Sequence, residues 1–202
     1  MRSTKTIKMA QMAILIAVVL IMAFTPLGYL KTAGLEISLI TIPVAIGAMV
    51  IGPAAGAVLG AVFGLTSFYQ CFGMSPFGAM LLSINPLYTF LVCVPTRILM
   101  GYLAGVLFKV FIKADKGNTV CYFVGGFMTA FLNTLFFMSI LILCFWNTDY
   151  IQEINATLGG LNPVLFVVAF VGINGIFEMT SSCIVGGVVS KAVSRTLYKK
   201  VV

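Results

Sequence analysis

Residues 37–68, ISLITIPVAIGAMVIGPAAGAVLGAVFGLTSF, decide the fold of this chain, because the stretch is apolar throughout and carries no charge. Hydropathy alone leaves open whether it forms one membrane span or two short ones. Gly52-Pro53 near its middle is a turn signal. The distribution of charge along the rest of the chain settles the choice in favour of two spans.

Ten of the 12 Lys and Arg residues form three clusters. Cytoplasmic segments of membrane proteins carry an excess of Lys and Arg, so the three clusters belong on one side. An even number of crossings must then separate Lys8 from Lys109, which requires that 37–68 be split. The clusters are Arg2, Lys5 and Lys8; Lys109, Lys113 and Lys116; and Lys191, Arg195, Lys199 and Lys200. Lys31 falls in a loop and Arg97 within a span.

The sequence therefore predicts an all-α integral membrane protein with six spans and both termini in the cytoplasm. The chain of 202 residues is treated as one domain, 1–202, that is 61% hydrophobic and only 8% charged. A soluble domain averages roughly 25% charged residues. The predicted spans are 9–30, 37–51, 53–68, 80–108, 119–146 and 163–190. The net charge of +7 lies at span ends, so we expect contact with anionic lipid and no nucleic acid.

Local sequence supports these boundaries and indicates close helix packing. Asn85-Pro86 and Asn162-Pro163 each read as an N-cap followed by a proline at the first helical position. Small residues recur every four positions, a spacing that lets membrane helices approach closely. They are Gly56, Gly60 and Gly64, then Gly101 and Gly105, and also Ala13 and Ala17. For the two alanines, an external helical partner is an alternative to internal packing.

Three predicted spans carry their most polar side chains at nearly one depth. Arg97, Asn133 and Glu178 lie twelve to fourteen residues from the inner ends of their spans, which is roughly 18–21 Å at the helical rise. Asn174 lies one turn outward of Glu178 on the same face. An isolated charge at this depth is costly, so Arg97 must face the interior and meet an acceptor. Pro95 frees the carbonyl of Leu91 nearby.

Two readings of this layer stay open. Arg97 and Glu178 form an ion pair that fixes helix packing, or both line a cavity that receives a polar solute. Residues 69–84 are an uncharged outer loop that includes Gln70, and they either rest at the headgroups or close over such a cavity. Tyr88 and Trp146 would then lie at its rim, and Asn85 is a further candidate substrate-binding residue.

Several kinds of chemistry are excluded or disfavoured. The chain has no histidine, and its five cysteines are scattered singly without a CxxC pair, so we expect neither a metal site nor a redox cofactor. A Ser/His/Asp triad is impossible, and no GxxxxGK[ST] motif is present to bind ATP. We expect no enzyme. The pattern favours a solute-binding membrane subunit whose energy comes from a partner.

The chain resembles the S-components of energy-coupling-factor (ECF) transporters, the membrane subunits that capture vitamins in bacteria and archaea. The resemblance rests on AILIA at 13–17, IGPAAGAVLGAVFGLTSF at 51–68 and VPTRILMG at 94–101. It implies high-affinity binding of a vitamin from outside and a multi-pass subunit of the bacterial cell membrane. It also implies docking through Ala13 and Ala17 on a transmembrane coupling subunit that carries two ATPases.

The segment FGLTSFYQCFGMSPFG at 63–78 is most similar to pantothenate-type members, with riboflavin, folate and pyridoxine types as alternatives. Arg97 would pair with the carboxylate of pantothenate, while Asn133, Asn174 and Gln70 bind its hydroxyls and amide. Riboflavin would instead require aromatic stacking on Trp146, Tyr88 and Phe72. An alternative of another class is a self-sufficient secondary transporter or channel, for which Glu178 is the one candidate coupling carboxylate.

Overall fold

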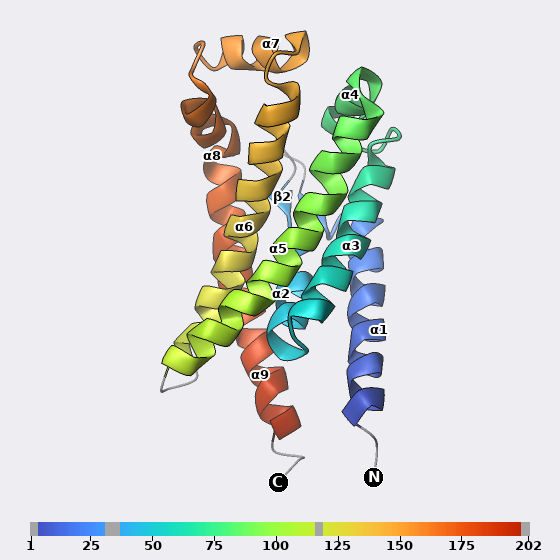
Figure 1. Ribbon diagram of the computed structural model, residues 1–202, viewed down its shortest axis with the longest axis vertical. Helices are drawn as coiled ribbons and strands as arrows, with labels where there is room; N and C mark the ends of the chain where they lie inside the picture. The colour runs from blue at the N-terminus through green and yellow to red at the C-terminus, as the bar shows by residue number, and fades with distance from the viewer. Residues whose placement is uncertain (1–3, 31–36, 116–118, 199–202) are drawn as a thin grey trace.

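The computed structural model describes residues 4–30, 37–115 and 119–198 as an elongated helical bundle (Figure 1). Its first described helix, α1 (Thr4–Ala23), begins at the same pole of the bundle at which its last, α9 (Gly187–Tyr198), ends. Within the described residues four helical segments are long and apolar enough to cross a membrane. They are Lys5–Ala23, Pro86–Ala114, Val120–Phe145 and Asn174–Thr196. The count of six spans stays a prediction.

The predicted span 9–30 is wrong at its end, because α1 stops at Ala23. Pro26 follows shortly and disfavours helical geometry at the residue before it. The chain then enters a two-stranded antiparallel sheet, β1 (Tyr29–Leu30) and β2 (Ile37–Ser38), in which Tyr29 faces Ser38. The bundle is therefore not purely α-helical. Lys31 lies outside the described residues.

The predicted break at Gly52-Pro53 is confirmed. Helix α2 (Thr41–Val50) ends just before it and α3 (Pro53–Gln70) begins at the proline. Gly52 has φ 130°, a conformation that favours glycine. With ten residues, α2 rises only about 15 Å, so it crosses part of the bundle. The hairpin leads the chain into the interior before α2 starts, which corrects the predicted span 37–51.

The predicted span 80–108 is wrong at its start, because two helices share this region. Helix α4 (Pro76–Ile84) is separated by Asn85 from α5 (Pro86–Ala114), the longest helix. Asn85 Oδ1 accepts hydrogen bonds from the backbone N–H groups of Leu87 and Tyr88, so its predicted role as N-cap is confirmed. Residues 69–84 are accordingly the end of α3, a turn and α4 rather than a loop.

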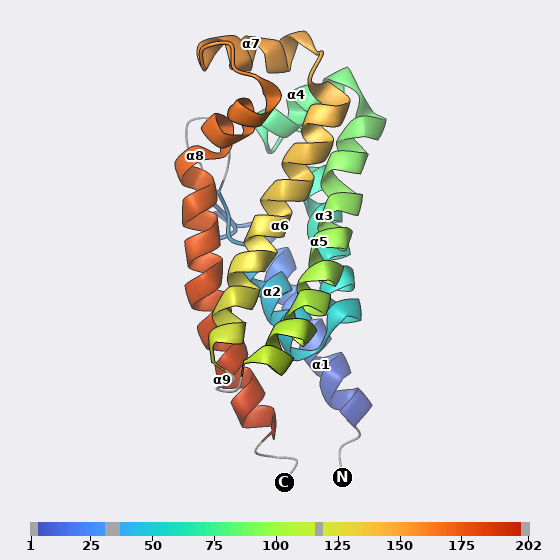
Figure 2. The same ribbon diagram turned by 60° about the vertical axis from the view of Figure 1, so that its left-hand side comes forward.

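The second half of the chain contains α6 (Val120–Phe145), α7 (Asp149–Thr157) and α8 (Pro163–Ser181). The N-cap at Asn162 is confirmed by a hydrogen bond from Leu165 N to its side chain, 2.9 Å long. Helix α8 is interrupted at Gly172 (φ 41°) and passes through a π-helical turn, Ser182–Gly186, into α9. The predicted span 163–190 thus continues to Tyr198. Figure 2 shows α8 and α9 forming one edge of the bundle.

Glycine packing joins α3 to α5, as the four-residue spacing predicted. A Cβ added to Gly56 would lie 2.1 Å from the carbonyl oxygen of Gly101, and one added to Gly64 would lie 2.8 Å from Val94 Cα. Such contacts are possible only for glycine, so the two backbones touch. This contact fixes the face that α5 presents to the interior, including Arg97.

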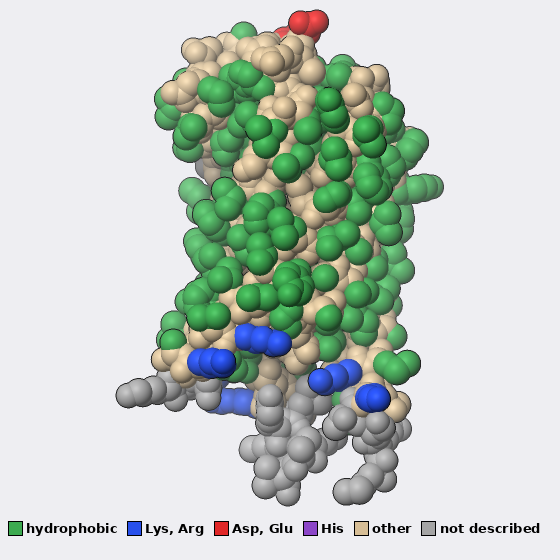
Figure 3. Space-filling model, in the orientation of Figure 1, with side chains coloured by type: hydrophobic (Ala, Val, Ile, Leu, Met, Phe, Trp, Pro, Cys, Tyr) green, Lys and Arg blue, Asp and Glu red, His purple; other side chains and the backbone are tan. Residues whose placement is uncertain are grey.

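Charge is segregated along the bundle. In Figure 3 a hydrophobic band covers the middle, Lys and Arg side chains gather at the pole where α1 begins and α9 ends, and the acidic side chains visible in this view lie at the opposite pole. Arg2, Lys116, Lys199 and Lys200 lie outside the described residues. The described basic residues agree with the side assignment that led to the predicted topology.

Candidate functional site

A cavity of about 350 Å³ is lined by elements that lie in the half of the bundle away from the start of α1 and the end of α9. The end of α3, the helix α4, the first half of α5, the second half of α6, α8 and the β hairpin all contribute to it. Its polar described lining residues are Tyr29, Ser38, Ser67, Gln70, Cys71, Ser75, Cys93, Arg97, Asn133, Thr134, Asn174 and Glu178. Polar side chains from elements far apart in the sequence therefore meet in one chamber.

Arg97 is buried on one side of this cavity, with 6% of its surface exposed. Its Nη1 donates to the carbonyl oxygens of Cys93 (3.0 Å) and Val92 (3.4 Å), not to Leu91 as the position of Pro95 suggested. The guanidinium carbon lies 4.5 Å from the ring centroid of Phe63 and 5.2 Å from that of Phe137. Two carbonyls and two aromatic faces thus hold the cation in place.

Glu178 and Asn133 meet on the other side. Asn133 Nδ2 donates to Glu178 Oε1 at 3.1 Å, which links α6 to α8 across 45 positions of sequence. Both side chains are buried, 8% exposed for Asn133 and 7% for Glu178. The amide fixes the orientation of the carboxylate.

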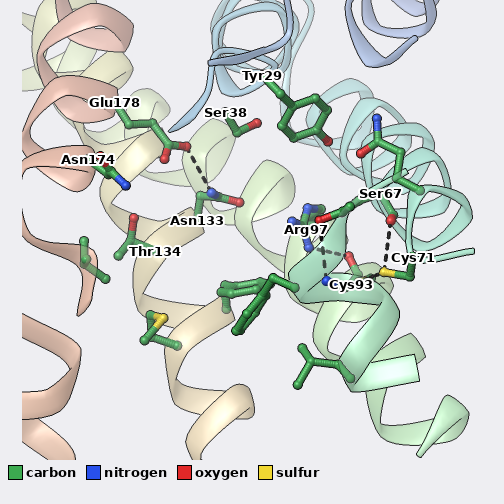
Figure 4. Close-up of a pocket in the computed structure, with 18 of the residues that line it drawn as sticks. Tyr29, Ser38, Ser67, Cys71, Cys93, Arg97, Asn133, Thr134, Asn174 and Glu178 are labelled. Carbon is green, nitrogen blue, oxygen red and sulfur yellow. Dashed lines mark hydrogen bonds between the residues drawn. The ribbon is translucent and has the colours of Figure 1, made fainter. Parts of the chain in front are cut away.

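Arg97 and Glu178 do not form the ion pair that one reading of the sequence predicted. Within the described residues no salt bridge joins them, and both line the cavity. Figure 4 shows Arg97 beside Cys71 and Cys93, and Glu178 beside Asn174, with Asn133 between the two groups. The prediction of one polar layer is therefore realised as two sides of one chamber, with the guanidinium of Arg97 on one side and the carboxyl group of Glu178 on the other.

The structure brings five of the eight predicted site residues to this cavity: Gln70, Arg97, Asn133, Asn174 and Glu178. Gln70 Nε2 also donates to the carbonyl oxygen of Ala23, which joins α3 to the end of α1. Asn85 caps α5 instead. Tyr88 packs edge-on against Phe145, and Trp146 packs edge-on against Phe166. Asn85, Tyr88 and Trp146 are therefore not among the described residues that line the cavity.

Sequence reasoning missed the residues that surround Arg97. Cys71 and Cys93 are buried with their sulfurs 4.0 Å apart, and Cys71 Sγ also bonds to the carbonyl oxygen of Ser67. The single, scattered cysteines of the sequence do not by themselves indicate that two of them meet beside Arg97. The signal available was position, because Cys93 stands one helical turn before Arg97 and therefore on the same face. Tyr29 and Ser38 also line the cavity, but no spacing in the sequence relates them to Arg97 or Glu178.

Ala13 and Ala17 lie on an exposed face of α1. Neighbouring apolar side chains on this helix are exposed as well, 64% for Ile14 and 60% for Ile21. Internal packing, one of the two roles considered for the alanines, is therefore not what they do. The face is available to lipid or to a partner helix.

The fold and the chamber define a membrane-embedded bundle that holds a polar site within an apolar exterior. The sequence model described as "ECF transporter, substrate-specific component" matches residues 7–189. The chain therefore belongs to the family of substrate-specific components of ECF transporters, a family of transporter components and not of enzymes. A search of curated proteins found no match.

Proposed function

We propose that this chain binds a small water-soluble vitamin, pantothenate in the first place, in the chamber between Arg97 and Glu178. The observation that carries the proposal is the set of buried polar atoms there that lack protein partners. Arg97 Nε, Asn133 Oδ1 and Ser38 Oγ have no hydrogen-bond partner within the described chain. Leaving buried polar groups unpaired costs free energy that water or a ligand must offset. The volume of about 350 Å³ falls within the usual range for ligand pockets.

The lining supports pantothenate over riboflavin. Pantothenate has a carboxylate for Arg97, and an amide and two hydroxyls for Asn133, Asn174 and Gln70. The aromatic residues expected to stack on riboflavin, Tyr88, Phe72 and Trp146, are not among the described lining residues, and Phe137, which does line the cavity, already covers the Arg97 guanidinium. Folate and pyridoxine types stay alternatives that a binding assay decides.

We propose further that uptake depends on a transmembrane coupling subunit and two ATPases. The exposed small-residue face of α1 at Ala13 and Ala17 supports this, since it would allow close approach of another helix. The chain itself contains no ATP-binding motif. The termini would face the cytoplasm of a bacterial cell, and the chamber would receive its solute from the outside.

Binding and uptake test the proposal separately. Isothermal titration of the purified protein with pantothenate, riboflavin, folate and pyridoxine should give saturable binding of pantothenate, and native mass spectrometry should detect a co-purified ligand. Uptake should require both the coupling subunit and active ATPases. A protein that binds no vitamin overturns the capture function. Uptake in cells without the ATPases would instead establish a self-sufficient transporter.

A further inference from the structure

The two sides of the chamber differ in the chemistry that they offer to a ligand. Among the described lining residues Arg97 is the only cation and Glu178 the only carboxylate. They come from two different helices, α5 and α8, which both pack against α6. A ligand that fills the chamber therefore meets a donor surface at one end and an acceptor surface at the other.

At the Arg97 end, the guanidinium has an unused hydrogen-bond donor that suits an anion. Nη1 is used by two backbone carbonyls, and the ring faces of Phe63 and Phe137 cover the group. Nε is buried without a partner. A guanidinium binds a carboxylate best through two parallel N–H groups, of which Nε is one in the common side-on geometry.

At the other end, Glu178 is held by Asn133 in a position from which its oxygens can accept further hydrogen bonds. Within the described chain its one hydrogen bond comes from Asn133 Nδ2, and it has no cationic partner there. A carboxylate has about four acceptor positions, so most of its capacity is unused. The side-chain oxygen of Asn133 points toward the Arg97 side of the chamber in Figure 4 but accepts no hydrogen bond from the described residues. Asn133 therefore leaves the unused Nε donor of Arg97 to a ligand.

We infer that the chamber selects ligands with an anionic group at one end and a hydroxyl or ammonium donor at the other, and that Glu178, oriented by Asn133, recognises the donor. This inference rests on the proposed function, because it assumes that the chamber is the substrate site. It assigns Glu178 a role in specificity that neither an ion pair with Arg97 nor a packing role would give. Ligands that lack either group should bind poorly.

Three related ligands test the two ends independently. Pantothenate carries both groups, pantothenol replaces the carboxylate by an alcohol, and dideoxypantothenate replaces both hydroxyls by hydrogen. Titration calorimetry should show both analogues binding at least about tenfold more weakly than pantothenate, in line with the strength of charge-assisted hydrogen bonds. Equal affinity for all three ligands would overturn the inference.

Variants then assign each end to its residue. Arg97→Met keeps an unbranched side chain between the two rings and should weaken pantothenate at least about tenfold while leaving pantothenol almost unchanged. Glu178→Gln should weaken pantothenate and pantothenol but not dideoxypantothenate, by a few fold for a hydroxyl donor and more for an ammonium donor. Exposed Arg195→Met and Glu153→Gln are matched controls that should change none of these affinities. A variant effect that is the same for all three ligands contradicts the inference.

A second measurement needs no knowledge of the ligand. In a variant that retains only Cys71 and Cys93, the anionic reagent sulfonatoethyl methanethiosulfonate should react faster than its trimethylammonioethyl counterpart when each rate is divided by the rate of that reagent with free cysteine, and Arg97→Met should abolish that preference. With Thr134→Cys as the sole cysteine, the cationic reagent should be faster, and Glu178→Gln should abolish this. Thiols that show no charge preference at either end overturn the two-ended chamber. If pantothenate does not bind but both preferences are found, only the proposed vitamin fails.

Discussion

A Cβ added to Gly60 in α3 would lie 2.1 Å from the carbonyl oxygen of Arg97 in α5. The residue that supplies the cation of the chamber is therefore seated directly against the backbone of another helix. The position of Arg97 depends on this glycine as much as on its own side-chain contacts.

Gly60→Ala should consequently destabilise the protein. Backbone contact leaves no flexible side chain to move aside, and overpacking of this kind costs about 1–3 kcal/mol. The midpoint of thermal unfolding in detergent, measured by size-exclusion chromatography after heating, should fall. Gly186→Ala is the control, because an added Cβ there meets its nearest atoms at 3.8 Å. Equal stability of the two variants would show that the helices separate more easily than the structure indicates.

Asn133→Leu should lower stability as well as ligand affinity. The substitution removes the donor to Glu178 Oε1 and leaves a buried carboxylate without its hydrogen bond, at a cost of about 1–3 kcal/mol. Thermal unfolding and calorimetric binding measure the two effects. Thr129→Val, one turn away on α6, is the control, since Thr129 bonds only to its own helix at Gly125 and does not line the cavity. If the Leu variant keeps its full affinity, Asn133 does not orient Glu178 for binding.

Asn85→Ala distinguishes a helix cap from a binding residue. The loss of the two hydrogen bonds to Leu87 N and Tyr88 N should cost about 0.5–2 kcal/mol of stability. Affinity for the vitamin should stay the same once the folded fraction is accounted for. Asn162→Ala removes the corresponding cap of α8 and should behave alike. If Asn85→Ala lowers the affinity for the vitamin and Asn162→Ala does not, Asn85 takes part in binding.

Sequence alone predicted the parts of the fold that depend on the type and spacing of neighbouring residues. The N-caps at Asn85 and Asn162, the turn at Gly52-Pro53 and the glycine contact of α3 with α5 all follow from residue type and spacing. The hairpin did not, because strands of two residues are too short to show an alternating pattern. Helix α4 is as apolar as its neighbour, so hydropathy merged them.

The same distinction holds for the chamber. Arg97, Asn133 and Glu178 were predictable because polar groups are rare and costly in a span. That the cation and the carboxylate face each other across a space instead of pairing depends on helix positions that only the folded chain defines. Of the residues around Arg97, Cys93 could be predicted from its spacing on α5, whereas Ser67 and Cys71 lie in another part of the chain and are residue types common in apolar segments.

The exposed face of α1 yields the last prediction. Ala13→Trp with Ala17→Trp places two large side chains where a partner helix would need close approach, while both positions are exposed and contribute no core packing. Pantothenate binding by the purified variant should equal that of the wild type, and uptake in cells with the full ECF module should be lost. Ile14→Trp and Ile21→Trp, also exposed on α1, add similar bulk at positions that already carry large side chains and should retain more uptake. Binding and uptake lost together would show that the alanines serve folding, and full uptake would show that the partner docks elsewhere.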